Sequence, residues 1–207
     1  TLIAGLALDE FVLIVPANSP HRTVRDLIEA ARRAPKNVKV GGSSAPSIDS
    51  IITHLVEKAT GVQFNFIAFK SGGEVMTNLL GSHIDVASAN PGEGLAQIQA
   101  KKARVLAAAS AKRLASLPDV PTLRESGIDV VATQWRGVTA PKGLPKDAES
   151  VLVSAFKRLS DSKIWRENYL TENNLTPYYM APEDFRRYLD DDTQKTRQIL
   201  TEMGLIK

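Results

Sequence analysis

The chain of 207 residues contains no cysteine, and its three histidines, His21, His54 and His83, are scattered along it. The absence of cysteine excludes disulfide bonds, thiolate zinc sites and cysteine nucleophiles. The histidines match no metal-ligand spacing, so neither a metal site nor a cofactor is predicted. Because many exported bacterial proteins also lack cysteine, this absence does not identify the cellular compartment.

A strong charge of one sign and a long apolar run are also absent. Lysine and arginine total 26 while aspartate and glutamate total 23, which gives a net charge of +3. Residues of both signs are mixed along the chain, so no nucleic-acid partner is predicted. No apolar run approaches the length of about 20 residues that crosses a membrane as a helix. The hydrophobic content of 43% is enough for one large domain or two small lobes.

The first residue is threonine, and no charged segment followed by an apolar segment marks a signal peptide. Residues 1–15 instead look like the middle of a folded domain, because apolar residues lead directly into a buried-looking strand at residues 10–15. We therefore expect that the chain starts after processing or is a fragment, and that part of the fold lies upstream.

Strand-like and helix-like segments alternate through the first half of the chain. The continuous apolar run at residues 11–15 is typical of a strand covered on both faces. The alternation that follows predicts an open parallel sheet flanked by helices, and hence an α/β fold. The predicted strands lie at residues 38–40, 64–69, 84–87 and 105–109.

The pattern changes after residue 110. A proline-rich connector at residues 117–122 leads to a strand within residues 130–139 that contains Trp135. A large aromatic residue in a strand favours a core position over a cleft wall. Three helices are predicted to follow, at residues 146–160, 161–170 and 182–203.

Three small polar loops follow predicted strands, at residues 41–47, 70–73 and 88–92. Ligands of open α/β sheets bind beyond the carboxyl ends of the strands, where these loops are expected to converge. Helix N-termini offer main-chain N–H groups there, and Lys70 adds one fixed cation, which together suit a carboxylate. The candidate ligand-binding residues are Gly42, Ser43, Ser44, Ser47, Lys70, Ser71, Gly72 and Asn90.

Each candidate also has a purely structural interpretation. The serines could serve only as turn residues and helix caps, with Ser47 as the N-cap. Lys70 could be a solvated surface lysine, and Asn90 before Pro91 could be a turn residue. Convergence of all three loops at one edge favours binding, because turn chemistry alone does not require it.

Several segments resemble signatures of a known family, the Bug receptors, which are the substrate-binding receptors of tripartite tricarboxylate transporters. The resembling segments are residues 69–85, 104–127 and 135–145. The sequence Leu-Pro-Asp-Val-Pro-Thr at residues 117–122 is the most specific of these features. The resemblance extends over the whole chain.

The resemblance implies a periplasmic, two-lobed receptor with a type II periplasmic-binding-protein-like fold, in which each lobe is an open, mainly parallel sheet flanked by helices. Residues 1–15 and 114–207 would then belong to lobe one, and residues 16–113 to lobe two. The receptor would close on a small carboxylate in an interlobe cleft and deliver it to membrane transporter subunits. A di- or tricarboxylate, an amino acid or an aromatic acid would suit such a site. The template also implies that an N-terminal part of lobe one, with a proline-glycine loop, is absent from this sequence.

The chain departs from the family pattern at several positions. Ala45 and Pro46 interrupt a loop that is usually richer in glycine, and Pro46 supplies no N–H donor. Ser50 and Ser71 stand where the family often has histidine and glycine. These departures imply a ligand that differs from those of better-known members.

Two other classes of function remain as alternatives. The effector-sensing domain of a transcription regulator shares the two-lobed architecture, although the sequence contains no helix-turn-helix. A hydrolase would need a base next to a serine, and Asp49 and His54 are five positions apart on one predicted helix, so they point in different directions. The sequence also lacks a Gly-x-Ser-x-Gly motif. Catalysis is not predicted.

Overall fold

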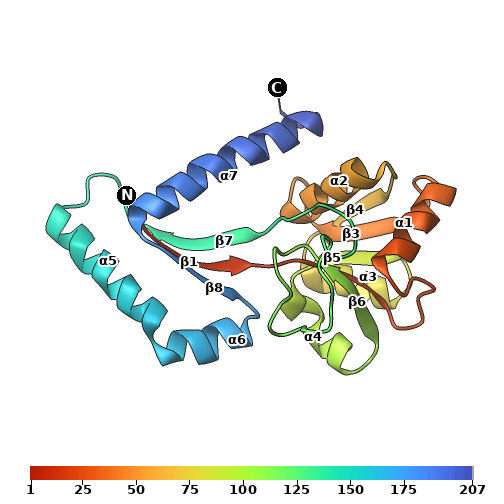
Figure 1. The fold of residues 1–207 in the computed structure, drawn as a ribbon, viewed down its shortest axis with the longest axis horizontal. Helices are drawn as coiled ribbons and strands as arrows, with labels where there is room; N and C mark the ends of the chain where they lie inside the picture. Colours follow the sequence, from red (N-terminus) through yellow and green to blue (C-terminus); the bar gives the residue numbers. More distant parts are fainter. Residues whose placement is uncertain (207) are drawn as a thin grey trace. The chain divides into compact units, whose positions relative to one another are not determined.

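The computed structural model describes residues 1–206 and divides the chain into two compact units (Figure 1). Unit 1 consists of Thr1–Asp9 and Gln134–Lys207, and unit 2 consists of Glu10–Thr133. The chain therefore passes between units twice, but at residues 9–10 and 133–134 instead of at the predicted boundaries after residues 15 and 113.

The shift of both boundaries has a physical cause. Residues 10–15 belong to unit 2 because strand β2 (Val12–Pro16) pairs with two other strands of the unit 2 sheet. Residues 114–133 stay with unit 2 because Leu123, Ile128 and Val130 are buried in its core. Thr122 also forms a parallel bridge to Ala108 in that sheet.

Unit 2 is built on a five-stranded sheet in which four strands run in one direction and β2 runs in the other. The strand order is β4-β3-β5-β2-β6. β3 pairs in parallel with β4 and β5, and β2 pairs antiparallel with β5 and β6. β2 begins where its neighbours end, because Val12 lies opposite Ala89 and Ala108. The other strands are β3 (Lys39–Ser43), β4 (Asn65–Phe69), β5 (Val86–Ala89) and β6 (Ala103–Ala108).

Helices cover both faces of this sheet, as the continuous apolar run of β2 predicts. Along β2, Leu13 and Val15 pack in one core cluster with α1 (Val24–Arg33) and α2 (Ile48–Thr60). Val12 and Ile14 pack in a second cluster with α3 (Gly72–Leu80), and Ile98 of α4 (Pro91–Gln99) packs against that cluster. Alternate residues of a strand point to opposite faces, so a strand between two helical layers is apolar throughout.

Unit 1 contains a three-stranded sheet that is antiparallel, and the prediction of a mainly parallel sheet in this part of the chain is wrong. β1 (Leu2–Asp9) pairs antiparallel with β7 (Gln134–Thr139) and with β8 (Thr176–Met180). Asp9, where β1 leaves the unit, lies opposite Gln134, where β7 enters it. A strand that leaves and a strand that enters at one edge must run in opposite directions.

Helices pack on this sheet as well (Figure 1). α7 (Pro182–Glu202) contributes Phe185, which is fully buried and meets the Trp135 ring edge-on at 5.2 Å. Trp135 also donates its indole N–H to the carboxylate of Asp192. α5 (Lys146–Asp161) is followed by a π-helix, η1 (Ile164–Tyr169), and a short α6 (Leu170–Glu172), where a single helix is predicted at residues 161–170.

No helix within residues 1–206 combines the length and apolar content that a membrane-spanning segment requires.

Candidate functional site

The three predicted loops meet at one edge of the unit 2 sheet. β4, β3 and β5 are neighbours and parallel, so their carboxyl ends lie side by side. The main-chain N–H of Ser44 donates to the carbonyl of Phe69 at 2.8 Å, which joins the first loop to the second. We call residues 43–47, 70–73 and 88–92 the loop edge. The predicted convergence is present, while ligand binding by these residues stays a prediction.

Three helices begin at the loop edge, because α2, α3 and α4 follow β3, β4 and β5. Each helix N-terminus carries partial positive charge from its unpaired N–H groups. Each first turn also carries one acidic side chain, namely Asp49, Glu74 or Glu93. Lys70 is an exposed cation in the second loop. The loop edge therefore combines helix dipoles and one ammonium group with carboxylates of the protein itself.

Asp49 is buried beneath the first loop and accepts three hydrogen bonds. Its Oδ2 accepts the main-chain N–H of Ser43 at 2.8 Å and the Ser43 hydroxyl at 2.9 Å. Its Oδ1 accepts the hydroxyl of the buried Ser88 at 3.2 Å. Burial raises the pKa of Asp49, and the hydrogen bonds from Ser43 and Ser88 oppose that rise. The carboxylate thus connects the ends of β3 and β5 to the first turn of α2.

Three main-chain N–H groups of the first loop, including that of Ser43, donate within the protein in this conformation. Ser43 donates its N–H to Asp49, and Ser44 donates its N–H to Phe69. Ser47 donates its N–H to Ser50 Oγ at 3.0 Å, because the two serines form a capping box at the start of α2. These three groups are therefore not available to a carboxylate in this conformation.

Gly42 is a packing glycine and not an exposed contact for a ligand. It is buried in β3, in register with Ala68 of β4. A Cβ at this position would lie 2.5 Å from the Cβ of Asp49 and 2.9 Å from Cζ of Phe66. Glycine is needed here so that the first turn of α2 can approach the strand.

The second loop is held by Glu74 and keeps its cation exposed. The N–H of Lys70 donates to Glu74 Oε2 at 2.9 Å, and Ser71 caps α3 by accepting the Glu74 N–H at 3.3 Å. Gly72 is buried against the carboxylate of Glu93, which occupies the space that a Cβ would need. Gly73 is exposed, and a Cβ there would make only an ordinary contact, 3.9 Å from Ser71 Oγ. The accessible residues of this loop are thus Lys70, Ser71 and Gly73.

The third loop is tied to the segment that leads into β2. Asn90 is the N-cap residue of α4, and its side-chain amide donates to the carbonyl of Glu10 at 3.1 Å. Pro91, the first residue of α4, has no N–H and leaves no orphan donor at that position. Asn90 is half-buried at the loop edge.

Asp49 is the residue of this site that sequence reasoning missed. Its position in the sequence suggested only a base for a serine nucleophile. Its position two residues after the N-cap Ser47 is a signal for a carboxylate at a helix N-terminus. Its contact with Ser88 joins residues 39 positions apart, and only the folded chain shows it.

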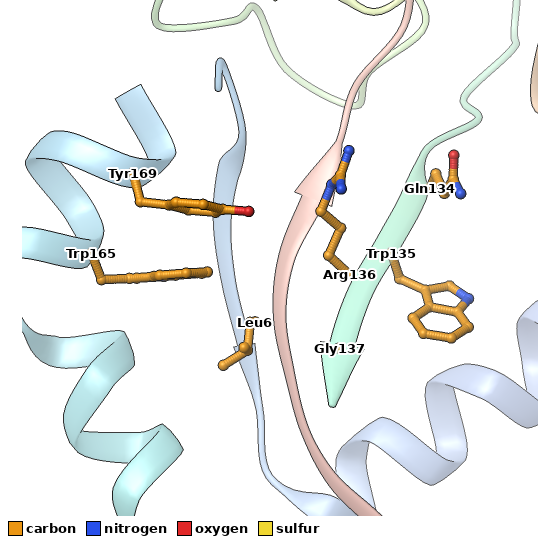
Figure 2. Close-up of a pocket in the computed structure, with 7 residues that line it drawn as sticks. All are labelled: Leu6, Gln134, Trp135, Arg136, Gly137, Trp165 and Tyr169. Atoms are coloured by element: carbon orange, nitrogen blue, oxygen red, sulfur yellow. The ribbon is translucent and has the colours of Figure 1, made fainter. Parts of the chain in front are cut away.

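Unit 1 contains a cavity of about 530 Å³ for which the sequence carries no local signal (Figure 2). The rings of Trp165 and Tyr169 stack on η1 with centroids 4.6 Å apart and an angle of 13° between their planes. Arg136 of β7 also lines the cavity, and its Nε donates to the buried carboxylate of Asp9 at 3.0 Å. The lining residues are Leu6, Gln134, Trp135, Arg136, Gly137, Trp165 and Tyr169.

The carboxylate of Asp49 should make stability depend on pH. Its pKa is raised above 3.8 in the folded protein, so the folded state binds this proton more tightly than the unfolded state. The contribution of Asp49 to stability is therefore full below pH 3.8 and is lost as the pH rises through the folded pKa. Asp49→Asn removes this titration, so the stability of the wild type relative to the variant should decline over that range. Urea unfolding followed by circular dichroism at a series of pH values measures the free energy of unfolding of both proteins. A wild type that becomes more stable relative to Asp49→Asn as the pH rises would contradict the assignment.

Within residues 1–206 no cluster of histidine and acidic side chains has the arrangement of a metal site.

A model of the receptor family of tripartite tricarboxylate transporters, TctC, matches residues 1–205. A Cupriavidus necator relative, described as a UPF0065 protein in the gbd 5' region, is 32% identical over 205 residues. That alignment covers 99% of this chain and 62% of the relative, so the chain spans less than two thirds of its length.

Two solved structures share the fold. A TctC solute-binding protein from Polaromonas superimposes with a TM-score of 0.80 at 29% identity, covering 97% of this chain and 69% of that one. An R. palustris protein solved with adipate gives a TM-score of 0.88 at 24% identity, covering 99% and 68%. The α/β fold class predicted from the sequence is confirmed by these neighbours. Because the family model matches nearly every residue, the chain belongs to the TctC receptor family of tripartite tricarboxylate transporters.

Proposed function

We propose that the protein is an extracytoplasmic, periplasmic solute receptor that captures a small carboxylate and delivers it to a membrane transporter. The observation that carries this proposal is the family match over residues 1–205. The R. palustris neighbour solved with adipate supports a carboxylate as the ligand class. The convergence of three helix-starting loops at one edge of unit 2 supplies a polar surface of the kind that such a ligand needs.

Within the loop edge, the accessible groups have different roles in binding: some supply charge and others supply hydrogen bonds. Lys70 supplies the formal positive charge, and the first turn of α3 at Gly73 supplies an accessible main chain next to it. Ser43 and Asn90 are half-buried and offer side-chain hydrogen-bond partners. Ser47 and Ser71 act mainly as helix caps that hold the loops in place. A ligand that makes more of these contacts in one conformation of the protein shifts the population toward that conformation.

Calorimetric titration with adipate, citrate, glutamate and benzoate tests the proposal, with neutral adipamide as the matched control. We expect saturable binding of at least one acid and none of adipamide. Failure of every acid to bind, or equal binding of adipamide, would overturn the carboxylate assignment.

Replacing Lys70 with glutamine should weaken carboxylate binding about tenfold, because the variant loses one charge-assisted hydrogen bond at an exposed position. The control is Lys101→Gln, which removes the same charge from the turn before β6, at the opposite end of the strands. Calorimetry with the tightest-binding acid measures both variants. Equal affinities of Lys70→Gln and the wild type would exclude Lys70 from the site.

A further inference from the structure

The single hydroxyl proton of Ser43 has a fixed direction in this structure. A serine hydroxyl has one proton to donate and two lone pairs that accept. Ser43 donates that proton to Asp49 Oδ2 at 2.9 Å, and its main-chain N–H donates to the same oxygen at 2.8 Å. What Ser43 Oγ can still offer to another group is therefore its lone pairs.

The Ser43 N–H favours this direction in both protonation states of Asp49. A main-chain N–H can only donate, so Oδ2 accepts the Ser43 N–H whether or not the carboxyl is ionised. The carbonyl oxygen of a protonated carboxyl is a better acceptor than its hydroxyl oxygen, so a proton on Asp49 is favoured on Oδ1, which faces the hydroxyl of Ser88. The Ser43 hydroxyl then keeps its proton on Oδ2 and its lone pairs free for another group.

The neighbouring hydroxyls of Ser47 and Ser88 are less suited to accept a hydrogen bond from a ligand. Ser88 is 1% exposed, which places it out of a ligand's reach. Ser47 gives its hydroxyl proton to the carbonyl of Ser44 at 3.1 Å and accepts the N–H of Ser50 at 3.3 Å. Ser43 is half-buried at the loop edge, at the end of β3 and beside the Lys70 loop. Its oxygen is thus an oriented acceptor within the proposed binding surface.

We propose that Ser43, oriented by Asp49, is a specificity-determining acceptor that selects acids carrying a hydroxyl or ammonium donor in addition to their carboxylates. This inference rests on the proposed carboxylate-binding function and narrows its ligand class to hydroxy or amino acids. It also reverses the role that the sequence suggests for Ser43, because an acceptor repels a carboxylate oxygen and attracts a donor. Asp49 acts through Ser43 as a positioning residue.

Malate and succinate provide the matched pair of probes, because they differ by one hydroxyl group. We expect the wild-type protein to bind malate more tightly than succinate by about three- to tenfold, the effect of one hydrogen bond. Ser43→Ala should remove this preference by weakening malate binding while leaving succinate binding within about twofold of the wild type. Ser43→Thr keeps the hydroxyl and should retain the preference.

The control variant is Ser154→Ala, which removes an exposed hydroxyl from α5, outside the loop edge, and should leave the preference intact. Equal binding of both acids by the wild type, or a preference that survives in Ser43→Ala, would overturn the selective role of Ser43 while leaving carboxylate binding in place. Binding of neither these nor any other acid would overturn the receptor function and this inference with it.

Discussion

Replacing Phe185 with alanine should lower the free energy of unfolding of unit 1 by about 3–5 kcal/mol, the usual cost of deleting a buried aromatic side chain. Phe185 has no exposed surface and sits where α7 meets the three-stranded sheet. Its ring meets Trp135 of β7 edge-on at 5.2 Å, fills the space in front of Gly137 and shares the space in front of Gly5 with Met180. The two glycines have no side chains of their own that could move into the resulting cavity, which leaves Met180 as the neighbour that can relax into it.

Tryptophan fluorescence is a selective probe for this experiment. Both tryptophans of the chain, Trp135 and Trp165, lie in unit 1, so their emission follows the unfolding of that unit. The midpoint of urea unfolding should fall in Phe185→Ala and stay close to the wild-type value in Val151→Ala, whose side chain is 65% exposed. A loss below about 1 kcal/mol would show that α7 contributes little to the core of unit 1.

Replacing Gly42 with valine should destabilise unit 2 by about 1–3 kcal/mol through overpacking. The new Cβ would lie 2.5 Å from the Cβ of Asp49 and 2.9 Å from the ring of Phe66, so the first turn of α2 must move away from β3. That movement pulls Asp49 from Ser43 and Ser88 and opens the network beneath the loop edge. Carboxylate affinity should therefore fall together with stability.

Unit 2 contains no tryptophan or tyrosine, so hydrogen exchange of its main chain is the suitable measurement. In Gly42→Val, peptides covering β3 and the first turn of α2 should exchange about 5- to 150-fold faster, in line with the expected loss of stability. The control is Gly73→Ala, because a Cβ at Gly73 would make only an ordinary contact with Ser71 Oγ at 3.9 Å and alanine favours a helix. Unchanged protection of β3 in Gly42→Val would contradict the close packing of α2 on the strand.

The local elements could be predicted because the signals for them are local. The caps Thr23 and Ser47 mark the starts of α1 and α2, and glycine in a left-handed conformation follows α2 at Gly61. The continuous apolar run in β2 correctly indicated a strand covered on both faces. The capping and periodicity that define these elements involve residues only a few positions apart.

Strand direction could not be predicted in the same way. Residues 2–9 and 134–139 are far apart in the sequence, and nothing in either segment specifies that they pair antiparallel. The boundaries between the units were displaced for a related reason. The apolar sequence of residues 12–16 is compatible with pairing in either unit. Only its pairing with β5 and β6 in the folded chain assigns it to unit 2.

In the candidate site, too, some features follow from the local sequence and others only from the tertiary structure. The sequence predicted the edge at which the three loops meet, since small polar residues after apolar strands mark the carboxyl ends of a parallel sheet, but β3 and β5 extend to residues 43 and 89, into two of the predicted loops. The direction of each hydrogen bond within the loops was not predictable, because Ser43 can donate to a ligand or to Asp49 with equal ease in an extended chain. Folding brings Asp49 under Ser43 and decides between the two.

By itself the sequence determined the family, the order of most helices and strands, and the positions of the loops, because these depend on residue types and short spacings. Tertiary structure alone decided the antiparallel sheet of unit 1, the cavity beside Trp165 and Tyr169, and the use of the Ser43 donors by a buried carboxylate. The physical reason is that strand pairing and buried hydrogen bonds join groups whose separation in the chain carries no information about their separation in space.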